Sequence, residues 1–224
     1  MPIYNAALTK INAEEARRYA GLQKAENFSQ VMIEEACEDA LLLAAPKGIW
    51  TVYDYDCLEG TVKGDFSCRL EGESIKKHLA GCEKVIFLAA TVGDGIESMV
   101  TRRFQNDEYT ASLLLDAAAT AAIEQVGDGI EKLLRPKAAA KGYAMRWRFS
   151  PGYGDWPIEQ QPEVARLSHA EEIGVRLSSA MMLVPRKSIT AVIGLYREDG
   201  KKEAAEHGKG CKACTRLDCP SRNI

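Results

Sequence analysis

The sequence predicts an α+β fold with a largely antiparallel β-sheet flanked by helices. Helical and strand-like segments alternate along the 224 residues, so both kinds of element contribute to the core. Late in the chain, two strand-like segments, Arg176 to Val184 and Ser188 to Tyr196, are separated by only three residues. Parallel strands need a crossover of a dozen or more residues, so we expect these two strands to pair antiparallel.

The first half of the chain carries the signals of three helices, which we expect over residues 13–20, 29–45 and 74–81. Asn12 and Glu15, three residues apart, are a capping pair for the first helix. Ser29 and Ser74 stand where the N-caps of the other two helices belong.

Two strands are expected in the same half. Ile49 to Cys57 is rich in aromatic and β-branched residues, and we expect it to pair with residues 67–70. Lys84 to Thr91 is a nearly unbroken apolar run, which indicates a central strand. Val92-Gly93-Asp94-Gly95 follows this run and is either an anion site at a helix start or a plain strand-to-helix turn. The plain turn is favoured, because no Gly-x-Gly-x-x-Gly or Walker pattern is present.

The second half begins with a long alanine-rich helix, expected over residues 107–134 with Pro136 beyond its end. Gly127 and Gly129 within it mark either a bend or a contact with a ligand. A strand over residues 142–150 and a helix over 163–173, capped by Gly174, follow.

The turn from Arg148 to Pro157 has the strongest chemical character. Arg148 offers a planar fork of donors that suits a carboxylate or a phosphate. Pro151 fixes its own φ, while Gly152 and Gly154 allow positive φ and close approach of a ligand. Tyr153 and Trp156 supply flat faces for a purine or a cation. The alternative is an ordinary strand-to-helix connection in which these aromatic rings only pack.

Two acidic residues are further candidates. The carboxylate of Glu124, on the alanine-rich helix, either meets the ammonium group of an amino-acid ligand or is a solvated helix charge, which is the commoner case. Asp155 is either a turn-stabilising side chain or a ligand contact.

Composition excludes some classes of function. The chain has 29 basic and 32 acidic residues, and its formal charge of −3 lacks the excess of positive charge that nucleic-acid binding requires. No apolar run approaches the roughly 18 to 20 residues that a membrane helix needs, and the start lacks the features of a secretion signal. We therefore expect a cytoplasmic protein without nucleic-acid or membrane partners, whose seven cysteines are thiols or metal ligands.

A composition shift near Glu198 predicts two parts, a domain over residues 1–200 and a cysteine-rich tail over 201–224. The tail carries one closely spaced set of metal-ligand types, His207, Cys211, Cys214 and Cys219. A Cys-x-x-Cys pair suits zinc or an iron–sulfur cluster, and the spacing does not choose between them. The fourth ligand is His207, a cysteine of the body (Cys37, Cys57, Cys68 or Cys82) or a residue of another subunit. A redox dithiol and an inert reduced tail are the remaining alternatives.

The Arg148 turn and a later segment, Leu177 to Thr190, together resemble the reactivation region of cobalamin-dependent methionine synthase. In that family, an Arg-Pro-x-Pro-Gly-Tyr turn and a Met-x-Pro-x-x-Ser-Val segment lie on the S-adenosylmethionine site. The resemblance is best over residues 107–193 and fainter over 12–21 and 84–95. It implies a bent antiparallel sheet.

The resemblance also implies a ligand site. We expect Arg148 to pair with the carboxylate of S-adenosylmethionine and Glu124 to meet its ammonium group. The backbone of Pro151, Gly152 and Tyr153 would meet the adenine edge, and the Tyr153 ring would cover the adenine or the sulfonium.

In the family, S-adenosylmethionine is held over inactive cob(II)alamin, a flavodoxin- or ferredoxin-type protein delivers an electron, and the methyl group is captured as methylcobalamin. This sequence has no Asp-x-His-x-x-Gly cobalamin motif. We therefore expect it to act in trans, as part of a methionine synthase (methyltransferase) system, on a cobalamin-binding methionine synthase or another corrinoid protein.

Two departures limit the comparison. The tyrosine-containing segment that follows the last strands in the family has no clear match, and the cysteine-rich tail stands in its place. The Gly-Tyr-Pro-x-Cys-Pro continuation of the family is Gly-Tyr-Gly-Asp-Trp-Pro here, so the side of the turn that faces the corrin is altered. The alternative function is a metal- or iron–sulfur-binding accessory or electron-transfer protein without S-adenosylmethionine chemistry.

Overall fold

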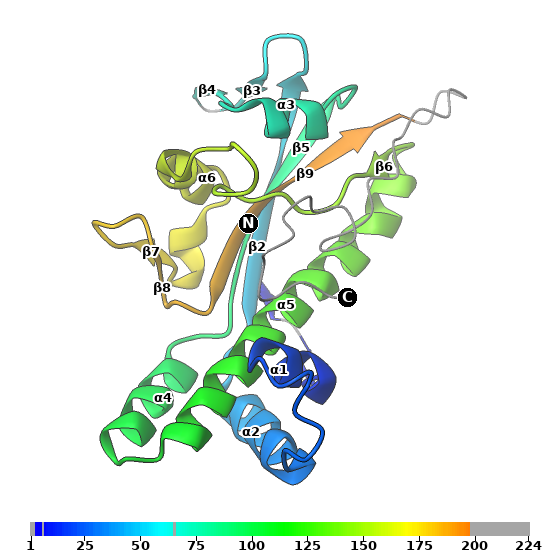
Figure 1. The fold of residues 1–224 in the computed structure, drawn as a ribbon. Helices are drawn as coiled ribbons and strands as arrows, with labels where there is room; N and C mark the ends of the chain where they lie inside the picture. Colours follow the sequence, from blue (N-terminus) through cyan, green and yellow to red (C-terminus); the bar gives the residue numbers. More distant parts are fainter. Residues whose placement is uncertain (1–2, 6, 65, 198–224) are drawn as a thin grey trace.

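The computed structural model describes residues 3–5, 7–64 and 66–197 (Figure 1). They form a seven-stranded sheet and a separate two-stranded hairpin, with helices on both faces of the sheet. All strand pairs among them are antiparallel. The predicted α+β class with a bent, largely antiparallel sheet is confirmed.

Three long strands form the centre of the sheet: β2 (Lys47–Asp56), β5 (Lys84–Thr91) and β9 (Ser188–Tyr196). β5 lies between the other two, so Leu88 is opposite Trp50 of β2 on one side and Ala191 of β9 on the other. Every residue of β5 after Lys84 is buried, because helices cover both of its faces. The apolar run is therefore the central strand that the sequence predicts.

Shorter strands complete the sheet: β1 (Tyr4–Asn5) and β3 (Thr61–Lys63) beside β2, β4 (Ser67–Arg69) beside β3, and β6 (Ala144–Met145) beside β9. The expected pairing of residues 67–70 with β2 is wrong, because β3 lies between them. The Asp56 carboxylate accepts hydrogen bonds from the N–H groups of Leu58 and Glu59, and this tight turn returns the chain beside β2.

The long helix α5 (Tyr109–Ala139) covers one face of the sheet (Figure 1). Three helices pack around it: α1 (Ala13–Tyr19), α2 (Gln30–Leu43) and α4 (Gly95–Gln105). The buried side of α5 is rich in alanine, including Ala118 and Ala122, and the small side chains let the neighbouring helices approach closely. Ile86, Leu88 and Ala90 of β5 point into this core.

The opposite face of the sheet is covered by two short helices, α3 (Glu73–His78) and α6 (Gln161–Leu167), and by the 3₁₀ turn Ala170–Ile173. Val85 and Phe87 of β5 point into this second core, together with Phe149 and Trp156. The alternation of side chains along β5 thus serves two cores at once.

The expected pairing of 176–184 with 188–196 is wrong. β7 (Arg176–Leu177) and β8 (Leu183–Val184) pair with each other in the separate hairpin, and β9 pairs with β5 and β6. A local turn explains the hairpin, since the Ser178 hydroxyl accepts hydrogen bonds from the N–H groups of Ala180 and Met182.

Three other bounds also differ from the expected ones. α5 continues past Pro136 to Ala139. The expected strand 142–150 is reduced to β6 and to a single bridge between Phe149 and Val192. The expected helix 163–173 is divided, because His169 takes a positive φ of 57° between α6 and the 3₁₀ turn.

Candidate functional site

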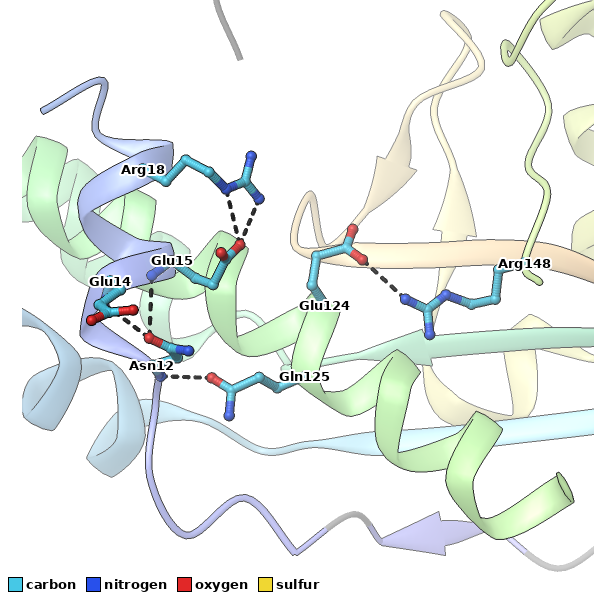
Figure 2. Close-up of polar contacts among 7 residues, drawn as sticks. All are labelled: Asn12, Glu14, Glu15, Arg18, Glu124, Gln125 and Arg148. Atoms are coloured by element: carbon cyan, nitrogen blue, oxygen red, sulfur yellow. Dashed lines mark hydrogen bonds and ion pairs between the residues drawn. The ribbon is translucent and has the colours of Figure 1, made fainter. Parts of the chain in front are cut away.

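Arg148 crosses from the segment after β6 to α5 and meets three carboxylates there. Its Nη2 lies 3.1 Å from Glu124 Oε2 and 2.9 Å from Asp128 Oδ1, and its Nη1 lies 2.9 Å from Glu131 Oε1. These acidic residues are four and three positions apart, so they share one face of the helix. Figure 2 shows the Arg148 side chain directed at Glu124 across the space between the two segments.

A glycine makes this approach possible. A Cβ atom on Gly127 would lie 2.9 Å from Arg148 Cζ and 2.8 Å from Ile189 Cδ1, closer than real carbon contacts allow. Gly127 is not one of the positive-φ glycines. It is the place where the Arg148 guanidinium lies against the helix backbone.

The surroundings keep Arg148 charged. Only 15% of the Arg148 side chain is exposed, and this burial lowers the pKa of the guanidinium. The negative charges of Glu131, Asp128 and Glu124 outweigh burial, so the pKa of Arg148 is raised. Glu131 is almost as buried as Arg148, with 11% of its side chain exposed. The Glu124 and Asp128 side chains are more open, at 41% and 62%.

These side chains line a pocket of about 240 Å³. Its complete lining is Glu124, Asp128, Glu131, Trp147, Arg148, Ser150, Tyr153, Ile189 and Ala191. Ile189 and Ala191 of β9 form an apolar wall, and Tyr153 is 52% exposed. Three predicted site residues, Arg148, Glu124 and Tyr153, thus meet in one pocket although they come from separate segments.

The turn itself is held by its own hydrogen bonds. The N–H of Gly152 donates to the carbonyl of Trp156 at 2.8 Å, and that of Tyr153 donates to the carbonyl of Ser150 at 3.1 Å. Gly152 takes a φ of 86° and Gly154 one of 58°, as their residue type predicts. Because these two N–H groups are engaged, the turn offers a ligand its side chains and carbonyl oxygens rather than these donors.

Trp156 and Asp155 have structural roles. The Trp156 ring is 1% exposed and donates from Nε1 to Gln160 Oε1 at 2.6 Å, so the expectation that it offers a face to a ligand is wrong. Asp155 accepts from the N–H groups of Glu73 and Ser74 at 2.9 and 2.7 Å and caps α3. Hydrogen bonds from the side chain and backbone of Ser74, and from the backbone of Glu73, lower the pKa of Asp155 to about 2.

Helix α1 stands on the other side of Glu124 (Figure 2). Gln125 fixes it to α5, accepting from the N–H of Asn12 at 2.8 Å and donating to the carbonyl of Lys10 at 2.9 Å. Burial and the Glu124 carboxylate raise the pKa of Tyr19, which places Glu124 within electrostatic reach of α1. Sequence reasoning missed Gln125, Asp128 and Glu131. The spacing of Asp128 and Glu131 along α5 would have placed these two on the face of Glu124, whereas Gln125 carries no such signal.

A second and larger pocket, of about 520 Å³, lies between the start of α4 and the β7–β8 hairpin. Its lining includes Asp94 and Glu97, from the predicted glycine turn and the helix that follows it. Arg186 donates hydrogen bonds from its backbone N–H and from Nε to the Glu97 carboxylate at 3.0 and 2.7 Å. The Gly93 N–H donates to Thr91 Oγ1 rather than pointing at an open site. This donor of the turn is thus engaged within the chain itself.

The predicted metal ligands His207, Cys211, Cys214 and Cys219 lie outside the described residues. Within the described ranges, no cluster of three histidine, cysteine or acidic side chains could hold a metal ion. Of the body cysteines, Cys37, Cys68 and Cys82 are buried and Cys57 is exposed. Burial raises the pKa of Cys37 and of Cys82 to about 11. In the same part of the chain, no helix has the length and hydropathy of a membrane span.

No protein-family model matches the sequence, and no curated protein matches it. Among solved structures, the MetH reactivation domain bound to AdoHcy is similar, with a TM-score of 0.61 over 88% of this chain and 79% of that one. The chain has the fold of that reactivation domain. The identity between the two is 11%, so the resemblance seen in the sequence is confirmed at the level of the fold.

Proposed function

We propose that this chain binds S-adenosylmethionine in the pocket beside Arg148 and supports reductive methylation of cobalamin held by a separate methionine synthase or corrinoid protein. The observation that carries the proposal is the meeting of Arg148, Glu124 and Tyr153 in one pocket. The similar reactivation domain was solved with AdoHcy, the demethylated form of this ligand, and it supports the same choice.

The chemistry of the pocket suits the methionine part of the ligand. At about 240 Å³ the pocket lies just below the roughly 300 to 1,000 Å³ that enclose a whole small molecule. The carboxylates of Glu124 and Asp128 suit the ammonium and sulfonium groups. The ligand carboxylate would take the place of Asp128 at Arg148 Nη2, because Asp128 is the most exposed of the three acids.

The adenosine part would then extend along the turn. The N–H groups of Gly152 and Tyr153 are engaged within the turn. The carbonyl oxygens of Pro151 and Gly152 can still accept hydrogen bonds from the amino group of adenine. The half-exposed ring of Tyr153 can cover the purine or the sulfonium.

In this role the chain binds and orients the methyl donor. Arg148, Glu124 and Tyr153 would fix the methionine part, and the apolar wall of Ile189 and Ala191 would keep water from one side of it. Cobalamin on the partner would supply the methyl acceptor, with its cobalt reduced by one electron from a flavodoxin- or ferredoxin-type donor, and S-adenosylhomocysteine would be the by-product.

Calorimetry with S-adenosylmethionine tests the binding step. We expect one site per chain in the wild type and at least about 10-fold weaker binding in Tyr153→Ala and Glu124→Gln, a loss of about 1.4 kcal/mol. Arg102→Ala, which removes an exposed arginine of α4 outside the pocket, is the matched control and should bind normally. Absence of binding in the wild type contradicts the proposal.

A spectroscopic assay tests the second step. The protein is mixed with a cob(II)alamin-loaded methionine synthase, S-adenosylmethionine and a reductant, and the methylcobalamin spectrum is followed. We expect the spectrum to appear only when this chain is present. Binding without methylation would show that the chain binds S-adenosylmethionine but does not support reactivation of cobalamin.

The cysteine spacing of the tail favours a second candidate, a metal- or iron–sulfur-binding accessory or electron-transfer protein. A cluster there would also suit the reactivation role, since it could deliver the activating electron. Iron, sulfide and zinc analysis of anaerobically purified protein decides between a cluster and zinc, and a sample without iron, sulfide and charge-transfer absorbance contradicts electron transfer by the tail.

A further inference from the structure

The cysteine tail contains three closely spaced thiols, Cys211, Cys214 and Cys219. Structural zinc sites and iron–sulfur clusters are both held by four ligands, and four cysteines serve either kind of centre. The three tail cysteines therefore need one further ligand to complete a metal centre. The sequence leaves His207, a cysteine of the body and another subunit open as its source, and the structure distinguishes between the body cysteines.

Among the described residues, one body cysteine lies at the surface and three do not. Cys37 and Cys68 are buried in the two cores. Cys82 is buried in the second core, and its Sγ lies against β9, where a Cβ on Gly194 would be 2.5 Å from it. Cys57, in the turn after β2, is exposed. A metal ion carried by the tail can therefore meet the sulfur of Cys57 without opening either close-packed core.

The strand register places Cys57 near the end of β9, from which the chain continues to the tail. Asp54 of β2, Lys84 of β5 and Leu195 of β9 lie in one row across the sheet. Because β2 and β9 are both antiparallel to β5, they run in the same direction and end at the same edge (Figure 1). At this row the two strands are two spacings apart, roughly 10 Å. Cys57 follows Asp54 by three residues, and Arg197 follows Leu195 by two. The first tail cysteine is 14 residues beyond Arg197, and such a stretch can reach up to roughly 46 Å.

Two polar groups close to Cys57 suit a negatively charged centre. Tyr55, two residues before Cys57, is 6% exposed, and its hydroxyl has no hydrogen-bond partner in the described part of the chain. This hydroxyl lies within electrostatic reach of the sulfurs of Cys57 and Cys82. Arg146 interacts with the Cys82 thiol and, within the described ranges, forms no ion pair with a carboxylate. Four thiolates leave a zinc ion with a formal charge of about −2, so an unused donor and an unmatched cation are a suitable outer shell.

We propose that Cys57 is the fourth ligand of a metal centre whose other ligands are the three tail cysteines, and that the Tyr55 hydroxyl donates a hydrogen bond to one of its thiolates. The centre would take zinc or an iron–sulfur cluster, since four thiolates hold either one. The inference rests on the metal-binding candidate for the tail and deepens it. It is independent of the S-adenosylmethionine pocket, whose described lining includes neither Cys57 nor Tyr55. Metal binding would then hold the tail at the end of the sheet.

Alkylation of the full chain, reduced and freed of metal without oxygen, identifies the ligands one by one. Iodoacetamide is added in the absence and in the presence of zinc, and mass spectrometry of the peptides follows each cysteine. We expect Cys57 to react in the metal-free chain, and zinc to slow its reaction at least about 10-fold, together with that of the three tail cysteines. Buried Cys37 is the matched control, because its slow reaction should not depend on zinc. Protection of the tail cysteines without protection of Cys57 overturns the proposal.

Cobalt(II) and zinc titrations of variants give a second measurement. The sulfur-to-cobalt charge-transfer absorbance grows with the number of thiolate ligands, so Cys57→Ser should lose about a quarter of it and should bind zinc at least about 10-fold more weakly. Tyr55→Phe should keep the four-thiolate spectrum and bind zinc about 10-fold more weakly. The metal-free Tyr55→Phe chain should be as stable as the wild type or more stable, because the hydroxyl has no partner there. His207→Ala should keep both the spectrum and the zinc affinity.

The outcomes separate the ligand, the centre and the proposed function. Unchanged zinc affinity in Cys57→Ser, or loss of one ligand in His207→Ala, overturns the role of Cys57. Wild-type zinc affinity in Tyr55→Phe overturns the hydrogen bond. A wild type that binds neither zinc nor cobalt and contains no iron and sulfide overturns the metal centre itself. Cys57→Ser should bind S-adenosylmethionine normally in calorimetry, so each of these failures leaves the proposed function standing.

Discussion

Arg148 Nη1 lies 2.9 Å from Glu131 Oε1, and both side chains are largely buried between α5 and β9. This ion pair joins the segment that follows β6 to the middle of the long helix. It sets the position of the guanidinium, and through it the geometry of the two more exposed carboxylates. The same pair therefore serves the stability of the fold and the proposed ligand site.

The first prediction concerns this pair. Arg148→Ala removes the closer of the two cations at the buried Glu131 carboxylate and leaves only the half-exposed Arg135 at 3.9 Å, and we expect the free energy of unfolding to fall by about 3 kcal/mol. The double variant Arg148→Ala/Glu131→Gln should recover part of that loss, because the buried charge is gone. Urea denaturation measures both. A double variant that is less stable than Arg148→Ala alone contradicts this account of the pair.

The second prediction uses two glycines of α5 as a matched pair. A Cβ on Gly127 would collide with Arg148 and Ile189, whereas one on Gly129 would meet only the Tyr4 hydroxyl at 3.9 Å. Gly129→Ala should therefore raise the free energy of unfolding by about 0.5 to 1 kcal/mol through helix propensity. Gly127→Ala should lose this gain and weaken S-adenosylmethionine binding. Equal behaviour of the two variants in thermal unfolding and calorimetry would count against the close approach of Arg148.

The third prediction concerns acid stability. The pKa of Asp155 is lowered to about 2 by hydrogen bonds from Ser74 and Glu73, below the ordinary value of 3.8. Since the folded-state pKa is the lower one, the stabilisation by Asp155 is present above pH 3.8 and is lost as the pH falls toward 2. The melting temperature of Asp155→Ala should lie below that of the wild type at pH 5, and the difference should shrink by pH 2. A difference that is constant over this range contradicts the capping role.

The fourth prediction concerns the two predicted parts of the chain. The sheet ends with β9 at Tyr196, and both cores are formed by residues before that point. A chain that ends at Arg197 should therefore keep its circular dichroism spectrum and its S-adenosylmethionine affinity. It should also lose any bound iron or zinc, because Cys211, Cys214 and Cys219 are removed. Loss of ligand binding on truncation would show that the tail belongs to the site.

Much of the fold could be predicted from local signals. The Asn12 cap, the Ser29 cap and the apolar run of β5 each give an element close to its predicted place, because each signal is satisfied within a few residues. The pairing of the strands was harder to predict from the sequence than the positions of the elements. The β7–β8 hairpin and the insertion of β3 depend on turns made by Ser178 and Asp56, and their side-chain hydrogen bonds are not visible as a pattern of apolar residues.

The grouping of side chains at the candidate site could be anticipated only in part. Residue type alone pointed to Arg148, Glu124 and Tyr153, and they share a pocket. Residue type alone could not tell that Trp156 faces the core, since its burial depends on the hydrogen bond to Gln160 and on packing against Phe149. The spacing of Asp128 and Glu131 places them on the same face of α5 as Glu124, but only the fold shows that this face meets Arg148 along about two turns of the helix.

A crystal structure with S-adenosylmethionine bound tests the central claim most directly. We expect electron density in the pocket of about 240 Å³, with the methionine part between Arg148 and Glu124 and the adenosine along the turn at Pro151. Density for the ligand in the larger pocket beside Glu97, or no density at a concentration that saturates calorimetry, would contradict the assignment of the site.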